Sequence, residues 1–167
     1  MGYTAPETTR LGTLTNIRIK CMHTIPERFY RVSVKALILN EARDAFLICK
    51  EDNGKWELPG GGLEWDADIK SELAREVREE MGLETTWIAD QPSYFFTFAF
   101  EHHVGWGANV IYETEVADLD FTPSEECQEI AFVNRDTVRD DMRLFSVVRQ
   151  LVVAFEPSRH SNQNHYY

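Results

Sequence analysis

Two neighbouring stretches, LPGGGLE at residues 58–64 and ELAREVREEMGL at residues 72–83, decide how the rest of this chain is interpreted. The first places three glycines in a row, and a backbone without Cβ atoms lets another group approach closely. Glycine loops that run into a helix N-terminus commonly hold phosphate or position a reacting group. The second stretch predicts such a helix over residues 68–81, because its apolar residues recur at helical spacing.

The predicted helix carries an acidic stripe beside an apolar one. At about 100° per residue, one arc receives the glutamates and the adjoining arc the apolar residues: Glu72, Glu76, Glu79 and Glu80, then Leu73, Ala74, Val77 and Met81. Like charges one turn apart destabilise a helix, so some compensation is expected. Two kinds remain open. Arg75 and Arg78 could pair with the glutamates on a solvated face, or a hard divalent cation could bind their oxygens.

Together, the loop and the helix resemble the Nudix box of the Nudix hydrolase (MutT-like) family. Its pattern is Gly, any five, Glu, any seven, Arg-Glu-aliphatic-any-Glu-Glu-any-Gly-aliphatic. Gly61 opens this pattern and residues 75–83 close it without a mismatch, but the first glutamate falls on Ala67. In the family that glutamate mainly supports the loop and the helix. The resemblance implies that Asp66 or Asp68 takes over this support, with activity that could be lowered without being lost.

The resemblance also implies a site for Mg²⁺ or Mn²⁺ and a base that deprotonates water. A downstream glutamate of the family is a further metal ligand or that base, and here Glu126 lies six residues before Phe132 of a predicted short strand. Glu129 is the rival candidate, and a solvated acidic loop is the alternative to both. The implied metal ligands are Glu76, Glu79, Glu80 and Glu126, and the candidate catalytic residues are Glu79, Glu126 and Arg75.

Substrate contacts are expected at the glycine loop and at one lysine: Gly60, Gly61, Gly62 and Lys50. The alternative for Lys50 is a solvated lysine at the end of its strand. An aromatic run at residues 94–100 predicts a packed core strand, with a base-stacking platform as its alternative. His102 and His103 flank a Gly-Trp-Gly turn and are interpreted as a solvated loop pair.

Hydrophobic periodicity predicts the remaining elements. A short first strand is expected at residues 17–22, and residues 31–39 and 45–50 should form a hairpin. Residues 85–88 begin a strand-rich region in which residues 94–100 and 109–116 should pair, and a second helix is expected over residues 142–155. This order permits an α/β/α sandwich around a mixed β-sheet, the fold that the family resemblance implies.

Composition indicates one globular domain. The 167 residues, 43% of them hydrophobic, suffice for a single domain over residues 1–156, followed by a flexible polar tail over residues 157–167. The net charge of −11 argues against binding to a nucleic acid duplex. Neither a signal peptide nor a membrane-spanning run is found in the sequence. The three cysteines lack metal-site spacing, so we expect reduced thiols in a cytoplasmic protein.

The activity implied by the resemblance is Mg²⁺-dependent hydrolysis of a diphosphate linkage. Its small-molecule substrate would be a nucleoside diphosphate linked to another moiety, which could be ADP-ribose, a sugar nucleotide, a dinucleoside polyphosphate or an oxidised nucleotide. No membrane partner is expected, and a homodimer is left open. Two other classes remain: a nucleotide sensor or binding module without turnover, which Ala67 keeps open, and a plain acidic interaction domain.

Overall fold

The fold is described for residues 29–100, 105–140 and 142–160 by a computed structural model. The expected strand at residues 17–22 and the two histidines His102 and His103 lie outside these ranges. Strands and helices follow one another in this order: β1 (Tyr30–Leu37), β2 (Phe46–Lys50), β3 (Lys55–Glu57), α2 (Ile69–Met81), β4 (Thr85–Ile88), β5 (Tyr94–Ala99), β6 (Trp106–Val116), β7 (Glu129–Val133), β8 (Arg143–Leu144), α3 (Ser146–Ala154) and the 3₁₀ turn η1 (Pro157–Arg159).

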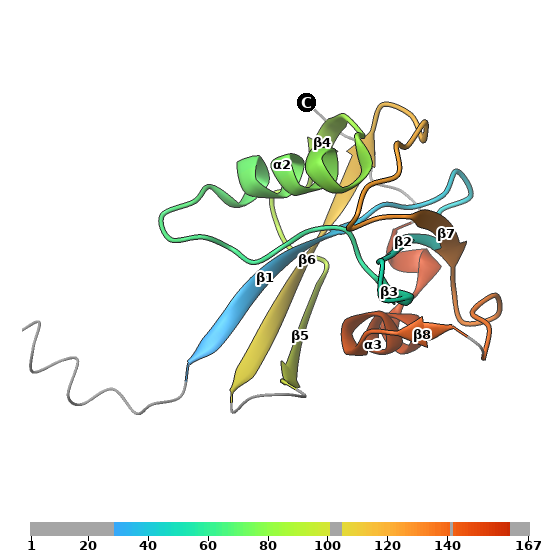
Figure 1. The fold of residues 1–167 in the computed structure, drawn as a ribbon. Helices are drawn as coiled ribbons and strands as arrows, with labels where there is room; N and C mark the ends of the chain where they lie inside the picture. The colour runs from blue at the N-terminus through green and yellow to red at the C-terminus, as the bar shows by residue number, and fades with distance from the viewer. Residues whose placement is uncertain (1–28, 101–104, 141, 161–167) are drawn as a thin grey trace, which may run out of the picture.

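The first sheet is built around the long strand β6 (Figure 1). Strand β1 pairs with β6 in parallel on one side, while β4 and β5 pair with it antiparallel on the other. Tyr94 lies opposite Ile111 in this register, so the predicted pairing between the aromatic run and the following strand is confirmed. The sheet is mixed, as the family resemblance implied.

The second sheet has the strand order β7-β2-β3-β8. The expected hairpin between residues 31–39 and 45–50 is therefore wrong over most of its length. The two strands meet only beside their turn, where Leu39 bridges Phe46 and the Leu47 N–H donates to the Ile38 carbonyl at 2.8 Å. Beyond that point β1 pairs with β6 and β2 pairs with β7, and both partners come from distant parts of the chain.

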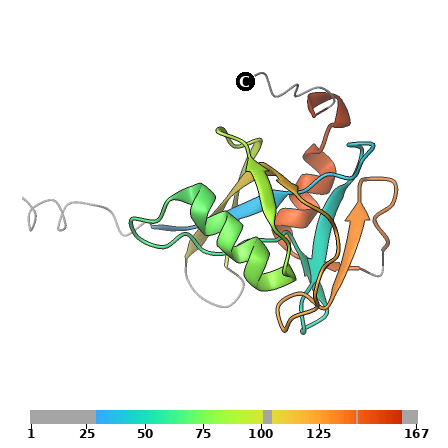
Figure 2. The ribbon, with the colours of Figure 1, turned by 90° about the horizontal axis from the view of Figure 1, so that it is seen from above.

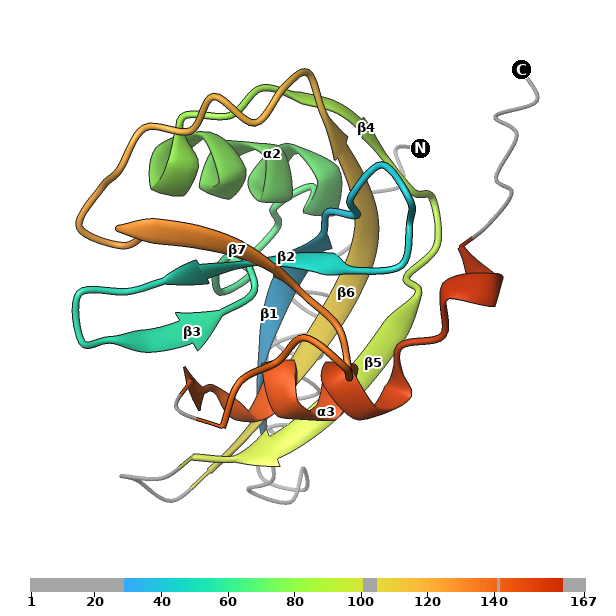
Figure 3. The ribbon, with the colours of Figure 1, turned by 90° about the vertical axis from the view of Figure 1, so that its right-hand side faces the viewer.

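One helix covers each side of the strands, with α2 above and α3 below in Figure 3. Successive side chains along β1 and β2 point to opposite faces, so both strands contribute apolar residues to the packing against α2 and against α3. Val34, Ala36 and Leu47 belong to the cluster beneath α2, whereas Leu37 and Phe46 belong to the cluster against α3. The predicted α/β/α sandwich is thus confirmed. None of the helices in the described ranges is long and apolar enough to cross a membrane.

Both helices have ends that local chemistry explains. The Asp68 side chain accepts a hydrogen bond from the Lys70 N–H at the start of α2, and Gly82 ends it with φ of 71°. This confirms the helix predicted over residues 68–81. The second helix is shorter than predicted, since Leu144 pairs with Trp56 in parallel and the Phe145 N–H donates to the Trp56 carbonyl, which keeps residues 143–145 extended.

The first residues of the expected tail, residues 157–160, are packed against the domain. Residues 157–159 form η1, and the following residue, His160, is only 3% exposed. Its Nδ1 lies 2.7 Å from Glu113 Oε2 and its Nε2 lies 2.9 Å from the Tyr94 hydroxyl. Arg43 completes this buried polar cluster through hydrogen bonds to Glu113 and to the His160 carbonyl. The cluster holds residues 157–160 against β5 and β6.

Candidate active site

The glycine loop lies along the free edge of β1 as if it were a further strand. Three backbone hydrogen bonds fix it: Val34 N–H to the Gly61 carbonyl at 2.9 Å, Ala36 N–H to the Pro59 carbonyl at 2.8 Å, and Leu63 N–H to the Val32 carbonyl at 2.9 Å. Because these donors and acceptors are paired along the strand, the loop is held in one conformation before it enters α2. Figure 2, which views the molecule from above, shows the loop running into that helix.

A Cβ atom on any of the three glycines would lie within 2.5 Å of a neighbouring group. A Cβ atom on Gly60, where φ is +115°, would lie 2.3 Å from the Val34 carbonyl oxygen. A Cβ atom on Gly61 would lie 2.5 Å from Glu76 Oε1. The close approach predicted from the sequence is therefore present, and on Gly61 the approaching group is a carboxylate of the helix. Gly62 packs in the same way against the Arg31 guanidinium.

Glu80 is the most buried glutamate of the box, with 9% of its surface exposed. Its Oε2 accepts a hydrogen bond from the Gly60 N–H at 3.0 Å. Burial raises the pKa of Glu80 to about 7, and the charges of Glu76 and Glu126 add to the rise, against the lowering effects of Lys35 and the Gly60 N–H. A carboxyl group with this pKa exchanges its proton in the neutral pH range.

Arg75 is the centre of the acidic stripe. Its guanidinium donates hydrogen bonds to three glutamates of α2: Glu72, Glu76 and Glu79. The arginine pairing that the sequence left open is thus present in the structure. The hydrogen bond from Arg75 lowers the pKa of Glu72. Glu72 is thus one of three partners of Arg75, and Asp68 caps the start of α2 through the Lys70 N–H.

Lys35 is a site residue that the sequence interpretation missed. It is 7% exposed, and its ammonium group donates to the carbonyls of Leu58, at 3.1 Å, and Gly60. Glu57 Oε2 lies 3.8 Å from the same nitrogen. A buried lysine must be paired to be tolerated. The signal was present in the sequence, since Lys35 is the one cation within the otherwise apolar run of residues 34–39.

The loop at residues 124–127 is hydrogen-bonded to α2 and brings Glu126 close to Glu80. The Ser124 hydroxyl donates to the Glu80 carbonyl at 2.6 Å and accepts from the Glu126 and Cys127 N–H groups at 3.2 and 3.0 Å. One serine side chain therefore ties the loop to the helix that carries the box. This positioning role was not visible in the sequence, because it depends on the end of α2 meeting a segment 44 residues further on.

An acidic cleft of about 380 Å³ opens where these elements meet. It brings together two of the predicted ligands, Glu80 and Glu126, and the loop residue Gly60. The other residues that line it are Lys35, Cys49, Glu51, Asp52, Glu57 and Glu125. Glu79 has an exposed side chain turned to Arg75, and Glu76 lies against Gly61. Lys50 does not belong to this lining and pairs with Glu129 at 3.1 Å.

The oxygen-rich lining suits a hard divalent cation, since carboxylates and backbone carbonyls are the ligands that Mg²⁺ prefers. Across the described residues, no three acidic, histidine or cysteine side chains yet converge on one point. The reason is visible at Arg75, which holds Glu76 and Glu79. Both side chains would have to rotate away from the arginine to join Glu80 around an ion.

Comparison with known proteins identifies the family of this chain. The family model for the NUDIX domain matches residues 29–151, which is most of the chain. The chain therefore belongs to the Nudix hydrolase family. Its box, its glycine loop and its α/β/α sandwich are those that the resemblance of residues 58–83 predicted.

Several relatives carry more particular names. Nucleoside triphosphatase NudI of Escherichia fergusonii is 30% identical over 129 residues, covering 68% of this chain and 89% of that protein. A MutT-like protein of Streptomyces ambofaciens is 44% identical over 54 residues, but the match spans only 35% of its length. Among solved structures, the MutT protein of Methanosarcina mazei Go1 is 27% identical with a TM-score of 0.60, covering 83% of this chain and all of that one.

Proposed function

We propose that this protein hydrolyses the diphosphate linkage of a nucleoside diphosphate joined to another moiety, in a reaction that depends on Mg²⁺ or Mn²⁺. The observation that carries the proposal is the buried Glu80 carboxylate, bonded to the Gly60 N–H at the end of a cleft lined by six carboxylate side chains: Glu51, Asp52, Glu57, Glu80, Glu125 and Glu126. Such a cleft repels a phosphate by itself, so an anionic substrate requires bound cations.

We assign different roles to the residues of the cleft. A divalent cation, when bound, neutralises charge on the diphosphate and lowers the pKa of a coordinated water. Glu76, Glu79 and Glu80 would hold the cation, and the Gly60 carbonyl beside the cleft accepts from Lys35. Lys35 supplies a fixed positive charge beside that carbonyl, suited to a phosphate oxygen. The glycine loop keeps this part of the cleft rigid and open.

Glu126 is our candidate for the base that accepts the proton of the attacking water. It lines the cleft and raises the pKa of Glu80, so its charge is close to the box. Glu129, the rival candidate, belongs to β7 and forms an ion pair with Lys50. The position of Ser124 supports the same choice, because its hydroxyl fixes the Glu126 backbone against α2.

The first substrates to test are nucleoside triphosphates, in which the second moiety is phosphate. Relatives with about 30% identity, matched over 89% of their length and 68% of this chain, bear the name nucleoside triphosphatase NudI. The cleft volume of about 380 Å³ lies within the usual range for small-molecule sites. We also propose a cytoplasmic location and a small-molecule substrate in place of a nucleic acid duplex, in line with the net charge of −11.

The test is a panel of nucleoside triphosphates, sugar nucleotides, ADP-ribose and dinucleoside polyphosphates incubated with Mg²⁺. Released phosphate is measured directly, after pyrophosphatase and after phosphatase treatment. We expect turnover that requires the cation and is lost in Glu80→Gln, with Glu129→Gln as the matched control that retains most activity. The absence of Glu from position 67 favours the second candidate, a nucleotide sensor. If a panel compound binds but no product forms over several hours, the proposal of a sensor would replace the proposal of an enzyme.

A further inference from the structure

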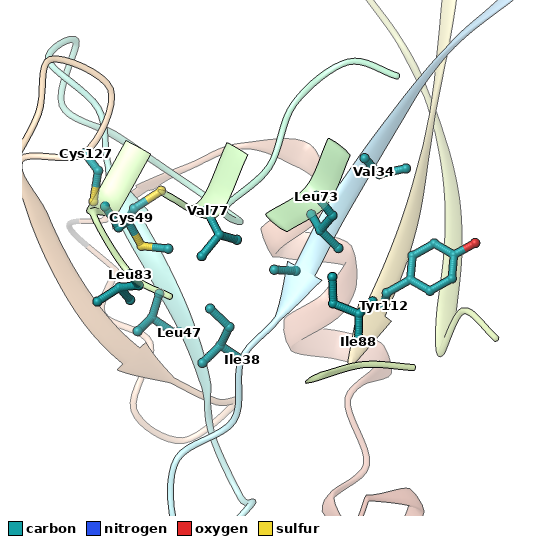
Figure 4. Close-up of a cluster of buried hydrophobic side chains, with 12 residues drawn as sticks. Val34, Ile38, Leu47, Cys49, Leu73, Val77, Leu83, Ile88, Tyr112 and Cys127 are labelled. Atoms are coloured by element: carbon teal, nitrogen blue, oxygen red, sulfur yellow. The ribbon is translucent and has the colours of Figure 1, made fainter. Parts of the chain in front are cut away.

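One face of the first sheet extends beyond the helix that covers it (Figure 1). Figure 4 shows the covered half, where Leu73 and Val77 of α2 pack together with Val34 and Tyr112. Because side chains alternate along a strand and paired residues point to the same side, this face can be followed to the ends of β1, β5 and β6. Seven residues continue it past α2: Tyr30, Val32, Phe95, Thr97, Ala99, Trp106 and Ala108. We call these seven residues the aromatic face.

The aromatic face exposes large apolar side chains to solvent. Tyr30, Phe95 and Trp106 are 52%, 61% and 52% exposed. The rings of Tyr30 and Trp106 lie side by side with centroids 6.4 Å apart, and the exposed residues Thr97 and Ala99 connect them to Phe95. A whole aromatic side chain presents about 150–250 Å², so the three rings expose roughly 300 Å². A contiguous apolar patch of this size on a soluble protein is often an interaction site.

The aromatic face carries no charge, although charged residues make up 27% of the chain and its net charge is −11. The neighbouring cation Arg31 alternates onto the opposite side of β1 and pairs with Glu64 at 3.2 Å. A nucleic acid strand would need cations beside the rings for its phosphates, and an anionic lipid surface attracts basic segments. Neither therefore suits this face. Two copies of the chain, by contrast, can meet here without bringing like charges together, and a two-fold axis would set the rings of one copy against those of the other.

We propose that the aromatic face is a dimer interface and that its partner is the aromatic face of a second copy of this chain. Sheets that pack face to face lie about 10 Å apart, which leaves room for rings from both copies between them. A stable interface takes about 800 Å² from each partner, so the rings supply its apolar core and the residues around them supply the rest. We therefore expect a reversible dimer and not an obligate one. Lys35 points to the opposite side of β1, so this inference does not depend on the function proposed above.

The experiment measures the mass of the full chain by sedimentation velocity from low to high micromolar concentrations. We expect the mass to rise from that of one 19.4 kDa chain to that of two. Trp106→Glu brings two like charges to the contact, so it should raise the dissociation constant at least about tenfold. Val153→Glu is the matched control, since it makes the same kind of change at an apolar side chain on α3 that is 67% exposed. It should associate as the unchanged protein does.

A second variant and a second measurement locate the contact. Phe95→Glu repeats the test on another strand, and circular dichroism checks that each variant is folded. Hydrogen exchange is then compared between low and high concentrations of the unchanged protein. Amides of residues 94–99 and 106–110 should exchange more slowly at high concentration, while those of α3 should not change.

Three results would overturn the interface: the mass of one chain at every concentration, a dimer that the folded glutamate variants still form, or slow exchange of the aromatic face that does not depend on concentration. The last result would mean that a segment of the same chain covers the face. A failure of the proposed function would appear as a lack of turnover, which none of these measurements uses.

Discussion

Replacing Glu80 by Gln should stabilise the protein when no metal is present. The pKa of Glu80 is raised from 4.5 to about 7, which corresponds to about 3 kcal/mol of cost for the ionised carboxylate at pH 8. Because the folded pKa lies above the unfolded one, the contribution of Glu80 to stability is fully present below pH 4.5 and is lost as the pH rises through 7. Gln keeps the shape and can still accept from the Gly60 N–H.

The measurement is thermal and urea unfolding of both proteins in EDTA at pH 8 and pH 5. We expect Glu80→Gln to gain about 2–3 kcal/mol at pH 8, or about 5–10 °C in Tm, and less than about 1 kcal/mol at pH 5. Mn²⁺ at 100 times its Kd should stabilise only the unchanged protein, by about 2.7 kcal/mol, and so close the gap.

Glu79→Gln is the matched control, since it makes the same substitution on the same helix at a side chain that is 60% exposed. Its stability in EDTA should change by less than about 1 kcal/mol, while its response to Mn²⁺ should be lost as well. If Glu80→Gln proves no more stable than the unchanged protein in EDTA at pH 8, burial of this carboxylate is not costly. A costly buried carboxylate at Glu80 would then be refuted.

Four further changes test the site and the fold. Glu126→Gln should lower kcat by about 10²- to 10⁴-fold in steady-state assays while substrate still binds, with Glu129→Gln much milder; equal small effects would place the base elsewhere. Ala67→Glu should raise turnover a few fold with little change in Mg²⁺ affinity, unless the loop is already fully held. Lys35→Met should move the pH midpoint of Mn²⁺ binding upward in calorimetric titrations, because Lys35 lowers the pKa of Glu80; an unmoved midpoint contradicts this. Glu113→Gln should cost about 3 kcal/mol at pH 7 and weaken the loss of stability on acidification. Burial raises the pKa of Glu113, but His160 and Arg43 lower it overall, so its contribution is present above the ordinary pKa of 4.5 and is lost as the pH falls through the lowered folded pKa; equal acid sensitivity of both proteins would exclude this role.

The sequence predicted the features whose causes are local. Helix α2 was bounded correctly because its periodicity, the Asp68 cap and the Gly82 end lie within one short segment. Long-range pairing was not predictable from the same signals. The apolar pattern of β1 shows that the strand is buried, but not that its partner is β6, more than 70 residues away, and a hairpin with β2 satisfied the pattern equally well.

The candidate site was predictable in part for the same reason. The Nudix box predicted Glu80 as a site residue, because a single helix fixes the spacing of the carboxylates in the box. Lys35 and Ser124 were missed, since each acts on the site only after distant segments meet. Lys50 was predicted as a substrate contact near the end of its strand, whereas in the structure its side chain donates to Glu129. Whether Lys50 contacts substrate stays a prediction.

The buried histidine at the end of the described chain has a practical consequence for anyone who shortens this protein. The family match ends at residue 151, nine residues before His160, so a boundary drawn from the shared domain alone would remove the partner of Glu113. A carboxylate with 1% exposure would then keep Arg43 as its partner and lose the imidazole on its other oxygen. Reporter fusions and crystallisation variants should therefore retain residues 152–160, and an affinity tag belongs after residue 160.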